Sequence, residues 1–147
     1  MNDHERRERN KAVVKEVYTN LYEWASAGKD VDFWRQYYTD DTVLEMPHMG
    51  LRQEGLESLM AGIGSVPQNF SSWKHGTFEF HDCLDPDEVI WEADADAVFR
   101  HSGEPYNQRY VLFVKMREGR IAKYVEYVNM AALAGFPPQP EPAVTAG

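Results

Sequence analysis

The sequence has little cysteine, little positive charge and no long apolar run, and each shortage excludes a class of protein. A single cysteine, Cys83, excludes an internal disulfide and a cysteine-ligated metal cluster, and it predicts a buried thiol in a reducing compartment. With 24 acids against 15 lysines and arginines, the net charge of −9 repels phosphate backbones, so we expect no nucleic-acid partner. No segment approaches the roughly 20 apolar residues that span a membrane, and the charged N-terminus lacks a signal-type core, so we expect no membrane contact and a cytoplasmic location.

The composition predicts one compact domain with a tail. The chain has 147 residues, of which 43% are apolar and 13% aromatic, enough to bury a substantial core. We expect this domain to cover residues 1–136. The remaining segment, 137–147, is rich in proline, has little to bury and is expected to form no structure of its own.

Apolar residues at helical spacing predict three helices in the first half of the chain. The first should run from about Arg9 to Ala27, with Gly28 as its cap. The second fits Val31 to Tyr38, and "TDDTVLEM" then reads as a turn into a short strand. The third fits Gln53 to Ile63, where "GSVPQNFSS" should end it.

The second half alternates as strands do. "WKHGTFEFHDCL", "EVIWEADADAVFRHSG", "YNQRYVLFVKM" and "RIAKYVEYVNM" predict four strands, the last two joined by a tight turn at Glu118 and Gly119. On the second of these strands, Glu92, Asp94 and Asp96 share one face, which we expect to contact solvent or a partner. The sequence therefore predicts an α+β fold in which helices cover one face of an antiparallel sheet.

This order of elements, with "YYTDDTVLEMP" and the closing "REGRI" and "EYVN" segments, resembles the nuclear-transport-factor-2-like superfamily from about Asn10 to Phe136. The resemblance implies a curved sheet wrapped by the helices into a cone, a ligand pocket inside it, and a homodimer formed through the sheet. Within the superfamily the chain resembles the SnoaL-like group. It is similar to the phenazine-biosynthesis A/B proteins in its "IW-x-E" strand and its "E-x-x-N" ending.

Ketosteroid isomerase and limonene epoxide hydrolase are more distant resemblances. Where the isomerase keeps its base, its tyrosine and its neutral aspartic acid, this chain has Met46, Leu21 and Val111. Where the hydrolase keeps an acid-arginine-acid triad, Glu126 supplies one acid and Ala93 stands in place of the arginine. The resemblance therefore does not extend to either mechanism.

Glu126 is the leading candidate for a catalytic acid or base. Its strand is mostly apolar apart from Arg120 and Lys123. The family position implies that the face of Glu126 looks into the cone, where desolvation would raise the pKa of a carboxyl group. A structural ion pair with Arg109 or Lys123 is the alternative. His48 is the candidate partner in proton transfer, or else a loop residue. Weaker candidates are the histidines at positions His75, His81 and His101.

Arg109 and Asn107 share a strand face and, if that face is the inner one, would orient polar groups of a substrate. A surface ion pair between Arg109 and the acidic strand is the other interpretation. The remaining expected lining residues are Tyr124, Met46, Trp91 and Tyr37. No spacing of ligand residues indicates a metal site.

These observations predict a cofactor-free enzyme that moves a proton on a small, largely apolar cyclic or polyketide-like metabolite, in an isomerisation, cyclisation or dehydration. Three alternatives stay open at this point. The chain could be an epoxide hydrolase with a rearranged triad, a non-catalytic binder of small molecules, or an interaction module that uses the sheet.

Overall fold

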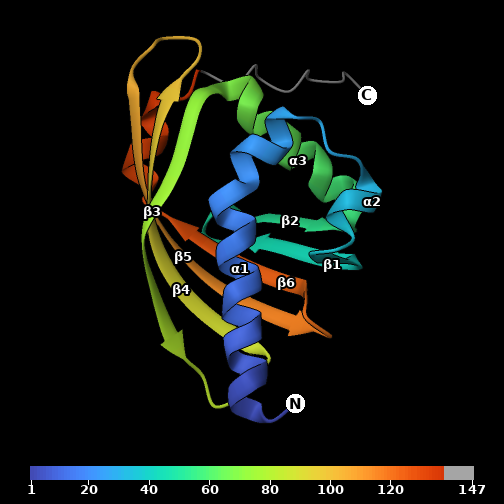
Figure 1. Cartoon of the computed structure of the whole chain (residues 1–147). Coiled ribbons are helices and arrows are strands. Elements are labelled where there is room, and N and C mark those ends of the chain that lie inside the picture. Colours follow the sequence, from blue (N-terminus) through green and yellow to red (C-terminus); the bar gives the residue numbers. More distant parts are fainter. Residues whose placement is uncertain (138–147) are drawn as a thin grey trace, which may run out of the picture.

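The computed structural model describes residues 1–137, so most of the expected tail lies outside the described residues and its boundary stays a prediction. Within this range the chain forms helices and a six-stranded sheet (Figure 1). In chain order the elements are α1 (Asp3–Ser26), α2 (Val31–Trp34), β1 (Tyr38–Met46), the 3-10 helix η1 (Pro47–Met49), β2 (Leu51–Glu54), α3 (Leu56–Asn69), β3 (Phe70–Asp82), β4 (Glu88–Phe99), β5 (Pro105–Arg117), β6 (Arg120–Val128) and the 3-10 helix η2 (Met130–Gly135).

The sheet has the order β2-β1-β6-β5-β4-β3 and curves around α1 and α3 (Figure 1). The expected α+β fold with a curved sheet is confirmed. One feature of the prediction was wrong, because the sheet is not wholly antiparallel: β1 runs parallel to β6, with Leu44 opposite Tyr124. The expected turn at Glu118 and Gly119 is confirmed, since both residues adopt the positive φ that a tight hairpin needs.

Two helix boundaries differ from those predicted. The second helix ends at Trp34 instead of Tyr38, because the backbone N–H of Ile121 donates to the Tyr37 carbonyl at 2.7 Å and draws this segment into the sheet. The third helix continues past Ile63 to Asn69 and includes Pro67, which has no backbone N–H to donate, and the helix ends two residues later. The stretch before it, 51–54, is strand β2.

α1 begins six residues earlier than predicted, because Asn2 forms a capping box with Glu5. The buried stripe of α1 includes Val14, Val17 and Tyr18 and packs on the concave face of the sheet. No helix of the described residues is long and apolar enough to cross a membrane.

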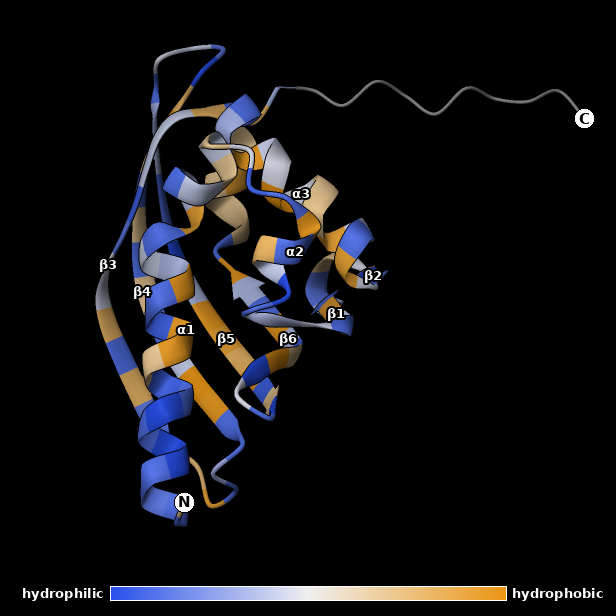
Figure 2. Cartoon of the chain, turned by 45° about the vertical axis from the view of Figure 1, so that its right-hand side comes forward, coloured by the Kyte–Doolittle hydropathy of each residue, from blue (hydrophilic) through white to orange (hydrophobic). Residues whose placement is uncertain are grey.

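Strand alternation gives the sheet a concave face that packs against the helices and a convex face that does not. On β5, Tyr110 and Leu112 are buried on the concave face, whereas Asn107 is exposed and Arg109 half-buried on the convex face. In Figure 2 the ribbons of β5 and β6 carry hydrophobic positions, coloured orange. Arg109 and Asn107 were expected to contact a substrate only if their face of the strand were the inner one. Both lie on the convex face, so they do not reach the interior.

The assignment of the two faces of β5 can be tested by stability. Leu112→Ala should lower the free energy of unfolding by about 2–5 kcal/mol, because the Leu112 side chain is fully buried. Asn107→Ala, on the convex face of the same strand, should change it by less than about 0.5 kcal/mol. Urea denaturation measures both values, and equal losses would contradict the face assignment.

Candidate functional site

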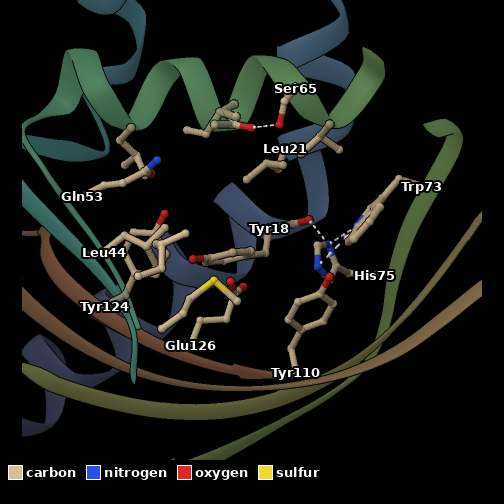
Figure 3. A pocket seen from close by; sticks show the side chains of 16 residues that line it. Tyr18, Leu21, Leu44, Gln53, Ser65, Trp73, His75, Tyr110, Tyr124 and Glu126 are labelled. Atoms are coloured by element: carbon tan, nitrogen blue, oxygen red, sulfur yellow. Dashed lines mark hydrogen bonds between the residues drawn. The ribbon is translucent and has the colours of Figure 1, made fainter. Parts of the chain in front are cut away.

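A cavity of about 360 Å³ lies between α1, α3 and the concave face of the sheet (Figure 3). We call it the polar lobe, because its walls carry most of the polar side chains that face the interior. Hydroxyl, amide, imidazole and carboxyl groups enter it from Tyr18, Gln53, Ser65, His75, Tyr110, Tyr124 and Glu126.

A second cavity of about 570 Å³ adjoins the polar lobe and shares part of its wall. We call it the apolar lobe, because the residues that line it alone are mostly apolar. These residues are Met49, Asn69, Phe70, Tyr106, Val128, Leu133 and Phe136. Glu126 lines both lobes and is the only charged side chain among the lining residues of either one.

The strand alternation of β6 points Glu126 into the cavity (Figure 3). Burial raises the pKa of its carboxyl group to about 7, because the charged form loses hydration there. The two ion pairs considered from the sequence are not formed. Lys123 lies 3.4 Å from Glu45, and Arg109 lies 3.0 Å from Asp94. A carboxyl group in this state exchanges protons near neutral pH.

Three tyrosines of the polar lobe surround this carboxyl group (Figure 3). Burial raises the pKa values of Tyr18, Tyr110 and Tyr124 well above the ordinary value, and the negative charge of Glu126 adds to each shift. The phenols therefore stay protonated at neutral pH and act as hydrogen-bond donors. The Tyr18 hydroxyl is buried near the Tyr38 hydroxyl, and within the described residues neither makes a hydrogen bond of normal geometry.

His75 lies in the polar lobe although sequence reasoning ranked it low. Burial lowers the pKa of its imidazole to about 4, so the ring is neutral. Its Nδ1 lies 3.0 Å from the Tyr18 carbonyl oxygen, and the Trp73 indole nitrogen lies 3.1 Å from Nδ1 and 3.4 Å from Nε2. A sequence signal for this position lies on β4, where Ala95 pairs with His75. Because alanine is small, it leaves room for the imidazole ring on the concave face of the sheet.

The expected contact between His48 and Glu126 is not formed. His48 stacks on Tyr127, with the ring centroids 5.3 Å apart. Tyr127 follows Glu126 along β6 and therefore points to the opposite, convex face. Both ring nitrogens of His48 are buried without a partner among the described residues, so His48 belongs to the surroundings of the convex face.

Arg109 also lies on the convex face, where its guanidinium group contacts Asp94 at 3.0 Å and Glu92 at 3.3 Å. The second interpretation of Arg109, an ion pair with the acidic strand, is therefore the one observed. Glu92 also lies near Glu79 and His81, in a group whose ligand atoms are within 4.8 Å of one another. The positive charge of Arg109 beside Glu92 opposes a metal ion at this position.

Two of the four expected lining residues reach the cavity and two do not. Tyr124 and Met46 line the polar lobe. Trp91 is fully buried beneath it and contacts the ring of Tyr18 at a centroid distance of 4.6 Å. Tyr37 stacks on Trp24 at the far end of α1 and donates to Glu16, so it lies outside the site.

The pH dependence of stability tests the burial of Glu126. Its folded pKa of about 7 exceeds the ordinary 4.5, so unfolding releases a proton between these values and the protein loses stability as pH rises through that window. Glu126→Gln removes this dependence. We expect its free energy of unfolding, relative to wild type, to increase by roughly 3 kcal/mol from pH 4.5 to pH 7.5.

Urea denaturation at a series of pH values measures this difference. The matched control is Tyr124→Phe, which alters the same wall without removing a carboxyl group and should differ from wild type by an amount that does not vary with pH. A difference for Glu126→Gln that stays constant across the range would contradict the buried-acid assignment.

Comparison with known proteins identifies the family. A family model described as a SnoaL-like domain matches residues 18–124. The uncharacterized PhzA/B-like protein PA3332 of Pseudomonas aeruginosa is 28% identical over 104 residues, which cover 68% of this chain and 73% of that protein. The resemblance to phenazine-biosynthesis A/B proteins is thereby confirmed.

Two solved structures show the same fold. A candidate isomerase from Bacillus subtilis superposes with a TM-score of 0.72 at 24% identity, covering 90% of this chain and 93% of that one. A candidate SnoaL-like polyketide cyclase from Jannaschia sp. CCS1 superposes with a TM-score of 0.69 at 17% identity, covering 86% and 90%. Since the family model spans most of the described residues, the chain belongs to the SnoaL-like domain family and has its nuclear-transport-factor-2-like fold.

Proposed function

We propose that the chain is an enzyme that moves a proton on a small, largely apolar cyclic or polyketide-like ketone. The observation that carries this proposal is Glu126: one carboxyl group, desolvated to a pKa of about 7, in a cavity whose other lining groups are uncharged. Such a group takes up and returns protons at neutral pH without a large free-energy change in either direction. The relatives described as a candidate isomerase and a candidate polyketide cyclase support the same class of reaction.

In the proposed reaction the Glu126 carboxylate removes a proton from the carbon next to the substrate carbonyl. The electron pair of the broken C–H bond forms a carbon–carbon double bond, and the carbonyl oxygen takes the negative charge. Neutral phenols such as Tyr18 and Tyr124 are placed to donate to that oxygen. In a β,γ-unsaturated ketone the enolate is a dienolate, and return of the proton from Glu126 to its γ-carbon moves the double bond into conjugation and completes an isomerisation. In a diketone, attack of the enolate carbon on the second carbonyl forms the ring bond, and the Glu126 carboxyl group returns the proton to the resulting alkoxide to complete a cyclisation.

The lining of the cavity distinguishes this proposal from epoxide hydrolysis. A rearranged triad needs an arginine and a second acid beside Glu126, and neither lobe is lined by one. Ala93, at the position of the arginine in the family resemblance, is fully buried in the core. A binder without catalysis has the same cavity and differs only in whether Glu126 turns over a substrate.

Deuterium exchange tests proton abstraction without knowledge of the natural substrate. 2-Tetralone, a bicyclic ketone with acidic C1 protons, should exchange them in D₂O faster with the protein than with buffer, as followed by NMR. Glu126→Gln should lower this catalysed rate by about 10²–10⁴-fold. The rate should rise with pH towards a plateau above about 7, because the base is the ionised carboxylate.

Asp96→Asn is the matched control, since it makes the same change of acid to amide on the exposed convex face and should retain the full rate. Wild-type protein that does not accelerate the exchange of this or related ketones would favour the binder. An active Glu126→Gln variant would remove Glu126 from the mechanism.

We also propose that the chain forms a homodimer through the convex face of the sheet. Val111, Phe113, Val125 and Tyr127 form an apolar patch there, on which Phe113 and Tyr127 are 43% and 40% exposed. Phe113→Asp should convert a dimer to a monomer in sedimentation velocity, whereas Asn107→Asp, on the same face beyond the patch, should not. A monomeric wild type at micromolar concentration would overturn this proposal.

A further inference from the structure

The two lobes of the cavity differ in chemistry and meet at one reactive group. They share seven lining residues, among them Glu126, Met46 and Tyr110, so a single molecule can occupy both. We propose that the substrate is elongated and amphipathic, with an oxygenated planar ring in the polar lobe, an apolar extension in the apolar lobe, and the reacting carbon beside Glu126. This assignment of the substrate class rests on the proposed function of Glu126.

The polar lobe suits a flat ring that carries an oxygen. Tyr18 brings a buried hydroxyl group that makes no hydrogen bond of normal geometry within the described residues, and Gln53 brings a side-chain amide. Aromatic walls stand on the opposite side, where the rings of His75 and Tyr110 lie 5.8 Å apart in an edge-on arrangement. An oxygen of the ligand would relieve the unpaired hydroxyl, whose desolvation is otherwise not compensated.

The apolar lobe has fewer polar groups than the polar lobe: of the residues that line it alone, only Asn69 and Tyr106 carry one, and the Tyr106 hydroxyl accepts a hydrogen bond from Gln108 at 2.8 Å. The chain after β6 forms one of its walls. Leu133 and Phe136 form this wall, facing Phe70 and Met49. The ring of Phe136 packs edge-on at 5.0 Å from Phe99 and 5.7 Å from Phe70. The lobe is therefore built from fixed aromatic and aliphatic surfaces, which bind apolar groups through burial.

Two features hold this wall at one position relative to Glu126. Gln108 and the backbone of Asn129 exchange two hydrogen bonds, of 3.1 and 2.6 Å, three residues beyond Glu126. At the other end of η2, a Cβ atom on Gly135 would lie 2.4 Å from the Phe99 ring, so only glycine allows this approach. The distance between the reacting carbon and the end of the apolar extension is therefore limited by the fold.

Binding calorimetry on the full chain, with two phenols that stand in for the enolic form of a ketone, tests the proposal. The probes are 2-naphthol and 6-butyl-2-naphthol, which differ only in four apolar carbons. Wild-type protein should bind the butyl compound roughly 10- to 100-fold more tightly, because the chain becomes buried in the apolar lobe. Leu133→Trp, which fills that lobe, should abolish the gain and leave the affinity for 2-naphthol within about threefold.

Met49→Trp narrows the same lobe from the β1–β2 connection and should also reduce the gain in affinity from the butyl group. If one of the two tryptophan variants does not fold, the other still tests the proposal. Phe113→Trp, on the convex face, is the control and should keep the whole gain. Equal affinity of the wild type for the two probes, no binding of either, or a gain that survives both tryptophans in folded protein would overturn the assignment.

The same measurement on Glu126→Gln separates this inference from the proposed function. The gain from the butyl group should persist in that variant, because the apolar lobe remains. A persistent gain together with full exchange activity of Glu126→Gln would reject the catalytic role of Glu126 and keep the binding mode. Loss of exchange activity in Glu126→Gln, without any gain in affinity from the butyl group, would keep the catalytic role of Glu126 and reject the binding mode.

Discussion

The desolvation of one carboxyl group is the constraint on which the site depends. Glu126 has a pKa near neutrality because α1 and α3 cover the concave face and reduce the contact of its carboxyl group with water. α1 is held at its N-terminal half by polar contacts with the β3–β4 connection, where the buried Asn10 donates to the Pro86 carbonyl at 2.9 Å. Contacts about two helical turns from the cavity thus help to set the chemistry inside it, because they fix the helix that carries Tyr18.

Room for the cavity comes from small residues in the middle of the sheet. Ala93 and Ala95 are fully buried on the concave face of β4, and His75 lies opposite Ala95 on β3. A larger side chain at Ala95 would displace the imidazole ring, and one at Ala97, which pairs with Trp73, would displace the indole ring. The same strand turns its acids to the convex face, where Arg109 offsets their mutual repulsion. Alternation along one strand therefore serves both the cavity and the opposite surface.

The sequence predicted the fold and the position of Glu126, because both follow from patterns that extend over many residues. Period-two alternation and the order of elements determine which face is buried, and an acid within an apolar strand stands out from its neighbours. His48 was placed wrongly, since a count of two residues across a turn does not carry the direction of a strand. β2 was missed because it is only four residues long. His75 was ranked low, because its neutrality arises from burial beneath a helix that is distant in sequence and its own neighbours do not indicate it.

Glu126 and His75 affect stability in opposite directions as pH changes. The folded pKa of Glu126 is raised from 4.5 to about 7, so its burial costs stability as pH rises through that interval. The folded pKa of His75 is lowered from 6.5 to about 4, so its burial costs stability as pH falls through that interval. Between pH 4.5 and 6.5 the two slopes oppose each other, and both groups are neutral in the folded state. Towards pH 7 the carboxyl group of Glu126 is present in both its protonated and its ionised form, while the imidazole of His75 stays neutral. The cavity then holds a base and its conjugate acid in comparable amounts, and Glu126 alone can both accept and return the proton that the proposed reaction requires.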